Sequence, residues 1–249
     1  MRRYERLAYW VNGLSFLMLV VVLVAGVRYQ NRFDPYLPIL LVLTIAAIVG
    51  SSTYLSRKVK MTPEMKREWL VKAVHFYREL GFFTEYGDLT DDKLATKLNS
   101  QYRKETGVSL DPTGPIAELQ VLEPDEKRLW LCDLERDVMP ENHVYADALN
   151  RLGEISRGAF QPTDITETWE SDKGPIRVEF TFGGVRHTLQ PKYREDRLDT
   201  DFLFRVRDLF KGTEYQLAIR PGDPIAAAFL TLEERDRIKK ERGLFFSMP

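Results

Sequence analysis

The chain has 249 residues but only one cysteine, Cys132, and three histidines. A single cysteine excludes an internal disulfide, which agrees with a reducing compartment. No two potential ligands have the spacing of a structural zinc site, so we expect no metal. A cysteine nucleophile would need His143 or His187 as its base. The apolar neighbours of Cys132 in "LWLCDL" favour a buried structural thiol instead.

Phosphate-binding motifs are also absent. The sequence has no GxxxxGK[ST] loop, no GxGxxG turn and no GxSxG elbow. We therefore expect no cofactor, and the sequence favours a non-catalytic protein. Asp196, Asp199 and Asp201 could bind a hard cation, but the sequence favours a solvated loop that leads into a helix, with the acids near the positive end of the helix dipole.

An excess of positive charge is missing as well. From Arg57 onward the chain carries 31 Lys and Arg against 35 Asp and Glu, a net charge of about −4. This balance is not that of a nucleic-acid-binding domain. The basic residues gather near the start of this part, where they could contact anionic lipid head groups: Arg57, Lys58, Lys60, Lys66 and Arg67.

Two runs contain no charged residue at all, Leu7 to Val27 and Pro35 to Leu55. Each has 21 residues, and a helix of that length covers roughly 30 Å, the thickness of a bilayer core. Buried helices of soluble proteins normally keep a polar stripe, which both runs lack. The first run is too long for a typical signal peptide and lacks its cleavage pattern. We predict a transmembrane helical hairpin in residues 1–56, with spans at about 7–27 and 35–55.

The short connector between the runs makes the hairpin antiparallel and places both termini on one side. Arg28 and Arg32 are its only basic residues. The flanks of the two spans carry nine: Arg2, Arg3, Arg6, Arg57, Lys58, Lys60, Lys66, Arg67 and Lys72. The positive-inside rule then predicts an inner-membrane protein with both termini in the cytoplasm. Small residues in the spans leave homo-oligomerisation open.

Residues 57–112 are expected to be a membrane-proximal helical segment. One helix begins with Pro63 at its first position and ends at Gly81. A second helix has Thr90 as its N-cap and ends at Gly107. The Pro- and Gly-rich stretch 109–115 is the expected boundary to the next domain.

Residues 113–249 predict a cytoplasmic α+β domain. We expect a strand at 128–134, a helix at 143–156 and a three-stranded meander over 164–193, in which Gly183-Gly184 forms a hairpin turn. A helix at 199–212, strands at 214–220 and 225–231, and a helix between Thr231 and Gly243 follow. The expected architecture is one antiparallel sheet covered by helices on one face.

These features favour a membrane-anchored binding or regulatory protein that recognises a protein partner at the inner membrane face. The candidate binding residues are Trp169, Glu167, Glu179, His187, Phe245 and Phe246. Two alternatives stay open. The hairpins could oligomerise and permeabilise the bilayer, or the domain could be an enzyme with a pocket that contains Glu167, Glu179, His187 or Asp199.

Overall fold

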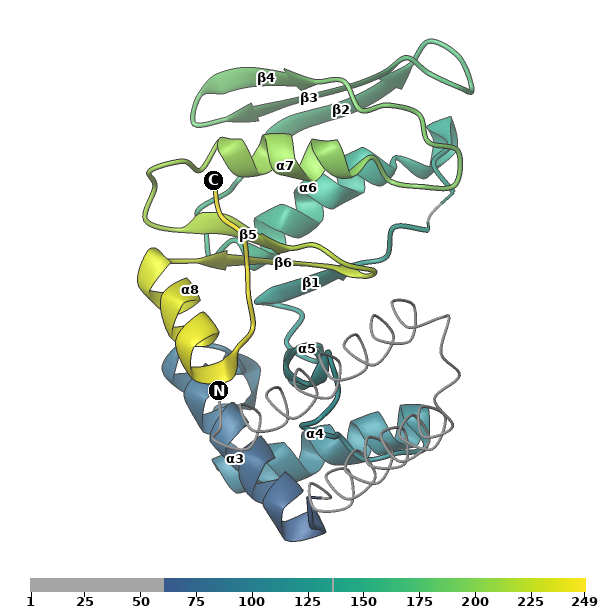
Figure 1. Cartoon of the computed structure of the whole chain (residues 1–249). Coiled ribbons are helices and arrows are strands. Elements are labelled where there is room, and N and C mark those ends of the chain that lie inside the picture. The colour runs from purple at the N-terminus through teal and green to yellow at the C-terminus, as the bar shows by residue number, and fades with distance from the viewer. Residues whose placement is uncertain (1–60, 136) are drawn as a thin grey trace, which may run out of the picture. The chain divides into compact units, whose positions relative to one another are not determined.

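The structure is a computed structural model that describes residues 61–135 and 137–249 (Figure 1). The predicted hairpin and the basic residues Arg57, Lys58 and Lys60 lie outside the described residues. No helix in the described part is long and apolar enough to cross a membrane. Residues from Pro63 to Pro249 form one compact unit.

Helices make up the first part of this unit. They are α3 (Pro63–Glu79), α4 (Asp91–Thr106) and α5 (Ala117–Leu122), with a 3₁₀ turn η1 (Thr84–Tyr86) between the first two. Thr90 caps α4 by accepting the Lys93 N–H, and Gly107 ends it with a φ of 78°. The predicted starts and stops of α3 and α4 are confirmed, whereas α5 was not predicted.

The remaining elements are β1 (Leu129–Cys132), η2 (Pro140–Asn142), α6 (Val144–Ile155), β2 (Thr163–Trp169), β3 (Ile176–Phe182), β4 (Val185–Leu189), α7 (Thr200–Asp208), β5 (Gln216–Arg220), β6 (Ile225–Leu230), α8 (Leu232–Arg237) and the π-helical turn η3 (Ile238–Arg242). The predicted α+β class and the meander β2-β3-β4 are confirmed. Thr231 and Glu234 form the predicted capping box at α8.

The expectation of a single sheet was wrong, because the strands form two antiparallel three-stranded sheets, with orders β1-β6-β5 and β2-β3-β4. All six residues of β6 are buried. A strand of this kind needs cover on both faces, whereas one with a solvated face alternates apolar and polar residues. Helices therefore lie on both sides of the sheet β1-β6-β5.

The described unit has four layers (Figure 1). The sheet β2-β3-β4 packs on α6 and α7, which lie on the sheet β1-β6-β5, and the helices α3, α4, α5 and α8 lie beyond that. Successive residues of β6 serve opposite cores: Ala226 and Ala228 contact the core of the outer helical layer, and Ala227 and Phe229 the core around α6 and α7. The small alanine side chains let helices approach the sheet from both sides.

Candidate functional site

Glu167 and Trp169 lie on the inner face of the sheet β2-β3-β4, opposite Val178 and Ile176 of β3. Helix α6 has no side-chain N-cap, since its cap residue, His143, is in the left-handed region. Glu167 takes this role from the neighbouring strand: Oε2 accepts the backbone N–H groups of Tyr145 and Ala146, both at 3.0 Å, and Oε1 accepts the Trp169 indole N–H. The positive end of the helix dipole also stabilises a carboxylate at this position.

His187 packs within the same sheet. It lies opposite Phe180 in the β3-β4 pairing, as predicted, and the two rings stack with centroids 5.2 Å apart. Cys132 is buried in the core around α6 and α7, with Sγ 3.5 Å from the carbonyl oxygen of Asp133. Among the described residues, no group of three His, Cys, Asp or Glu side chains is placed to bind a metal ion.

Asp199 and Glu167 both form a hydrogen bond with Tyr145 of α6. The Asp199 N–H donates to the Tyr145 hydroxyl at 3.1 Å, and the Asp199 carboxylate accepts the Lys192 N–H at 2.8 Å. Burial raises the pKa of Tyr145 to about 12. Together, the hydrogen bonds of Glu167 and Asp199 connect α6, β2 and the loop before α7, so this polar cluster has a structural role.

Glu179 lies on the outer face of the sheet β2-β3-β4, the face opposite Glu167. It is in the central strand β3, between Thr166 and Thr188. Arg177 Nη2 is 2.5 Å from Glu179 Oε1, Arg186 Nη2 is 3.2 Å from Oε2, and the Thr188 hydroxyl is 3.3 Å from Oε1. Arg177, followed by Arg186, lowers the pKa of the Glu179 carboxyl. Thr166 and Thr168 of β2 lie beside these residues on the same face.

This outer face is a polar sheet surface that the described residues leave uncovered. Figure 1 shows α6 and α7 on the inner side of the sheet and no described element over its outer side. Both arginines are about half exposed, and they bring one more positive charge than Glu179 neutralises. We define the outer face by Thr166, Thr168, Arg177, Glu179, Arg186 and Thr188.

The two edges of the sheet differ. The edge of β2 carries a register shift between Thr163 and Thr166 and lies close to α6, and both features hinder further pairing. β4 is an edge strand that pairs only with β3 among the described strands. Its first residue, Val185, is an exposed hydrophobic side chain. The geometry allows another strand to pair with β4.

Lys66 and Arg67, which the sequence assigned to lipid, form ion pairs within the described unit. Lys66 Nζ lies 2.6 Å from Asp111 Oδ2, and Arg67 Nη2 lies 2.6 Å from Asp92 Oδ1. Both pairs are partly exposed, so each cation can still reach solvent on one side. The two aromatic residues of the tail are divided: Phe246 is buried, and Phe245 is 51% exposed.

Sequence reasoning missed a buried arginine, Arg128, and a partly buried ion pair between Glu118 and Arg242. Arg128 is only 5% exposed, and its Nη1 donates to the carbonyl oxygens of Leu80 and Gly81 at the end of α3. Burial lowers the pKa of Arg128 to about 10. Its Nε and Nη2 have no hydrogen-bond partner within the described part of the chain. Glu118 and Arg242 form a partly buried ion pair, with Oε1 and Nη2 2.7 Å apart. No local motif marks either group, because the partners are far apart in sequence.

Comparison of the chain with protein-family models, curated proteins and solved structures finds no match.

Proposed function

We propose that this chain is a membrane-anchored binding protein of the cytoplasmic face, and that its outer sheet β2-β3-β4 recognises a protein partner. The observation that carries the proposal is this uncovered polar face beside the open edge of β4. The two uncharged runs in the sequence support the anchor, and the nine flanking basic residues support its orientation.

The chemistry of the face favours a peptide or protein strand as the ligand. An added strand would pair with the backbone of β4, while the exposed guanidinium groups of Arg177 and Arg186 bind its acidic side chains. Trp169 and Glu167, by contrast, support this surface from beneath, since both belong to the inner face.

The test is an affinity pull-down of the full-length protein from its native membranes, with bound proteins identified by mass spectrometry. We expect a stoichiometric partner that is lost in the variants Val185→Asp and Arg177→Ala/Arg186→Ala. The matched control is Arg103→Ala/Lys104→Ala on α4, which also removes two exposed cations. Exposed ion pairs contribute about 0–1 kcal/mol, so the arginine variant is expected to stay folded.

Equal partner recovery by every folded variant would show that the outer face is not the binding surface. Recovery of a homo-oligomer without any partner would instead favour the alternative, in which the hairpins assemble and permeabilise the bilayer. Leakage from dye-loaded vesicles would then separate an assembled effector from an inert oligomer.

A further inference from the structure

The C-terminal tail is held against the domain in a regular alternation. Leu244 and Phe246 are buried in the core of the outer helical layer, whereas Phe245 between them is exposed. Two backbone bonds pair the tail with β5: Ile219 N–H to Ser247 O at 2.9 Å, and Ser247 N–H to Ile219 O at 2.8 Å. The outward position of Phe245 is thus set by strand geometry.

Two exposed lysines accompany this aromatic side chain. Lys239 Nζ lies 5.3 Å from the centre of the Phe245 ring, and Lys240 follows it on η3. We call Lys239, Lys240 and Phe245 the tail patch. Aromatic and basic side chains together are typical of surfaces that enter the head-group region of a bilayer, where the ring is buried and the cations bind anionic lipid.

The segment that carries the tail patch packs against α3, the first helix of the described unit. The Arg242 guanidinium, at the end of η3, is 5.7 Å from the Trp69 ring of α3. Helix α3 starts at Pro63, eight residues after Leu55, the predicted end of the second span. A chain of that length reaches at most about 27 Å, so it keeps the start of α3 close to the bilayer.

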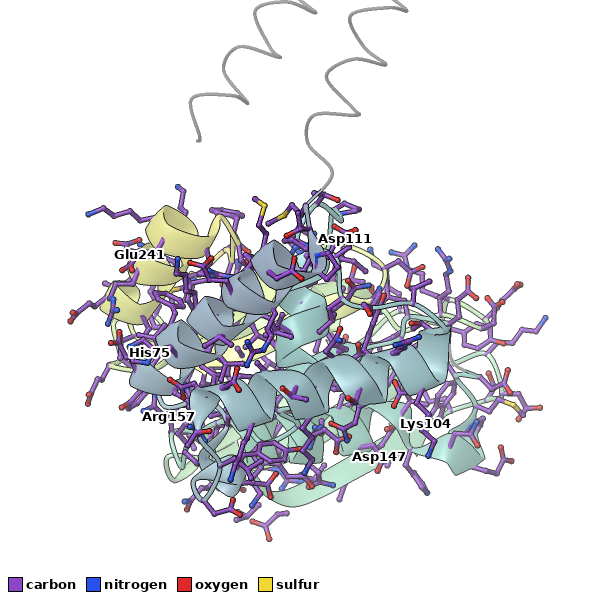
Figure 2. The ribbon with its side chains drawn as sticks, turned by 90° about the horizontal axis from the view of Figure 1, so that it is seen from below. His75, Lys104, Asp111, Asp147, Arg157 and Glu241 are labelled. Carbon is purple, nitrogen blue, oxygen red and sulfur yellow. The ribbon has the colours of Figure 1, made fainter. Side chains whose placement is uncertain are left out.

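A second contact agrees with this placement. Lys66, in the first turn of α3, pairs with Asp111. Figure 2 shows Asp111 and Glu241 in the upper part of the view, with Glu241 at the left, and Lys104 and Asp147 at the lower right. Glu241 belongs to η3, so in this view η3 and the partner of Lys66 lie on the same upper side.

We propose that the tail patch is a second membrane contact, in which Phe245 enters the lipid interface and Lys239 and Lys240 bind anionic head groups. The inference rests on the proposed membrane anchor. It holds the cytoplasmic domain in one orientation, with the end that carries the tail patch against the bilayer. A protein that covers the tail patch is the competing occupant, and the test separates the two.

The test uses the full-length chain in vesicles of phosphatidylcholine with about 30% phosphatidylglycerol. A Glu241→Cys variant carries an environment-sensitive fluorophore, which will not label the buried Cys132. A second labelled variant, Lys104→Cys, reports from the lower right of the view in Figure 2. We expect quenching by nitroxide-labelled lipids at position 241 and none at position 104.

In the chain labelled at position 241, Lys239→Ala/Lys240→Ala should lower the ratio of membrane-bound to unbound tail patch about thirtyfold. Phe245→Ser should lower this ratio further. Arg103→Ala/Lys104→Ala is the control for charge and should leave quenching unchanged. If the chain resists alkaline carbonate extraction but position 241 is not quenched, the tail-patch inference is overturned and the proposed membrane anchor is not. A blue-shifted signal that lipid nitroxides do not quench would also overturn it, because a protein then covers the patch. Extraction of the chain by carbonate would instead overturn the proposed anchor.

Discussion

Glu118 joins three helical segments through its two oxygens. The Tyr77 hydroxyl of α3 donates to Oε2 at 2.8 Å, and Arg242 of η3 donates from Nε to Oε2 at 3.0 Å and from Nη2 to Oε1 at 2.7 Å. Burial, followed by the negative charge of Glu118, raises the pKa of Tyr77. The pair holds the start of the tail on α5.

Replacing Glu118 by Ala leaves a partly buried guanidinium without its acceptor. We expect the free energy of unfolding to fall by about 2 kcal/mol, measured by urea denaturation. Glu126→Ala, at an exposed position a few residues later, is the control and should change it by less than about 0.5 kcal/mol. Equal effects of the two variants would contradict the assigned role.

Asp111 is the residue from which a pH dependence follows most directly. Hydrogen bonds from Lys66, then from the Thr113 hydroxyl and N–H, lower its pKa to about 2. A folded-state pKa below the unfolded value adds stability above about pH 4, and this is lost as the pH falls toward 2. The contribution is small because the pair is exposed to solvent.

An NMR titration of the Asp111 carboxyl should therefore show a midpoint near pH 2. Lys66→Met should raise that midpoint toward the usual value of about 4, though only in part, because Thr113 still donates two hydrogen bonds. A midpoint that Lys66→Met leaves in place would show that the lysine does not hold this carboxylate.

At the scale of elements, α6 depends on a strand for its N-terminal cap. Glu167 of β2 accepts two amides of the first turn, which His143 leaves without a side-chain acceptor. We expect Glu167→Ala to lower the free energy of unfolding by about 1–2 kcal/mol. Hydrogen exchange should show faster opening at Tyr145 and Ala146, whereas Glu154→Ala on the exposed side of α6 should leave both amides protected.

The tail forms one β-bridge to β5, between Ser247 and Ile219, with the Phe246 ring buried and the Phe245 ring exposed. Phe246→Ala should destabilise the protein by about 3 kcal/mol, because it leaves a cavity in the core of the outer helical layer. Phe245→Ala should change stability by less than about 0.5 kcal/mol. Thermal unfolding of both variants checks this contrast, and a comparable loss for Phe245→Ala would place that ring in the core.

At the scale of the whole unit, β6 separates the two hydrophobic cores and contributes residues to both. Ala227 and Ala228 are adjacent in sequence but contact opposite helical layers. Leucine at either position overfills a packed interior and should cost about 1–3 kcal/mol. Because both cores share the sheet β1-β6-β5, each variant should shift one cooperative transition to lower temperature. Two separate transitions in calorimetry would show that the cores unfold independently.

Local signals in the sequence determined most elements of the described part. Thr90 with Gly107 and Thr231 with Glu234 mark helix ends, because a capping side chain acts on amides only a few residues away. Gly183 and Gly184, both with positive φ, set the hairpin that aligns Phe180 with His187. These helix ends and this hairpin depend only on residues that are close in sequence.

Only the tertiary structure decided how the strands divide and what the charged residues do. Leu129 of β1 pairs with Ala228 of β6, a contact between distant segments that no local period encodes. Glu167, a candidate binding residue from the sequence, caps α6 from a neighbouring strand, and Phe246 is in the core while Phe245 is exposed. Side-chain type and spacing determine which elements form, whereas the burial of each face depends on long-range packing.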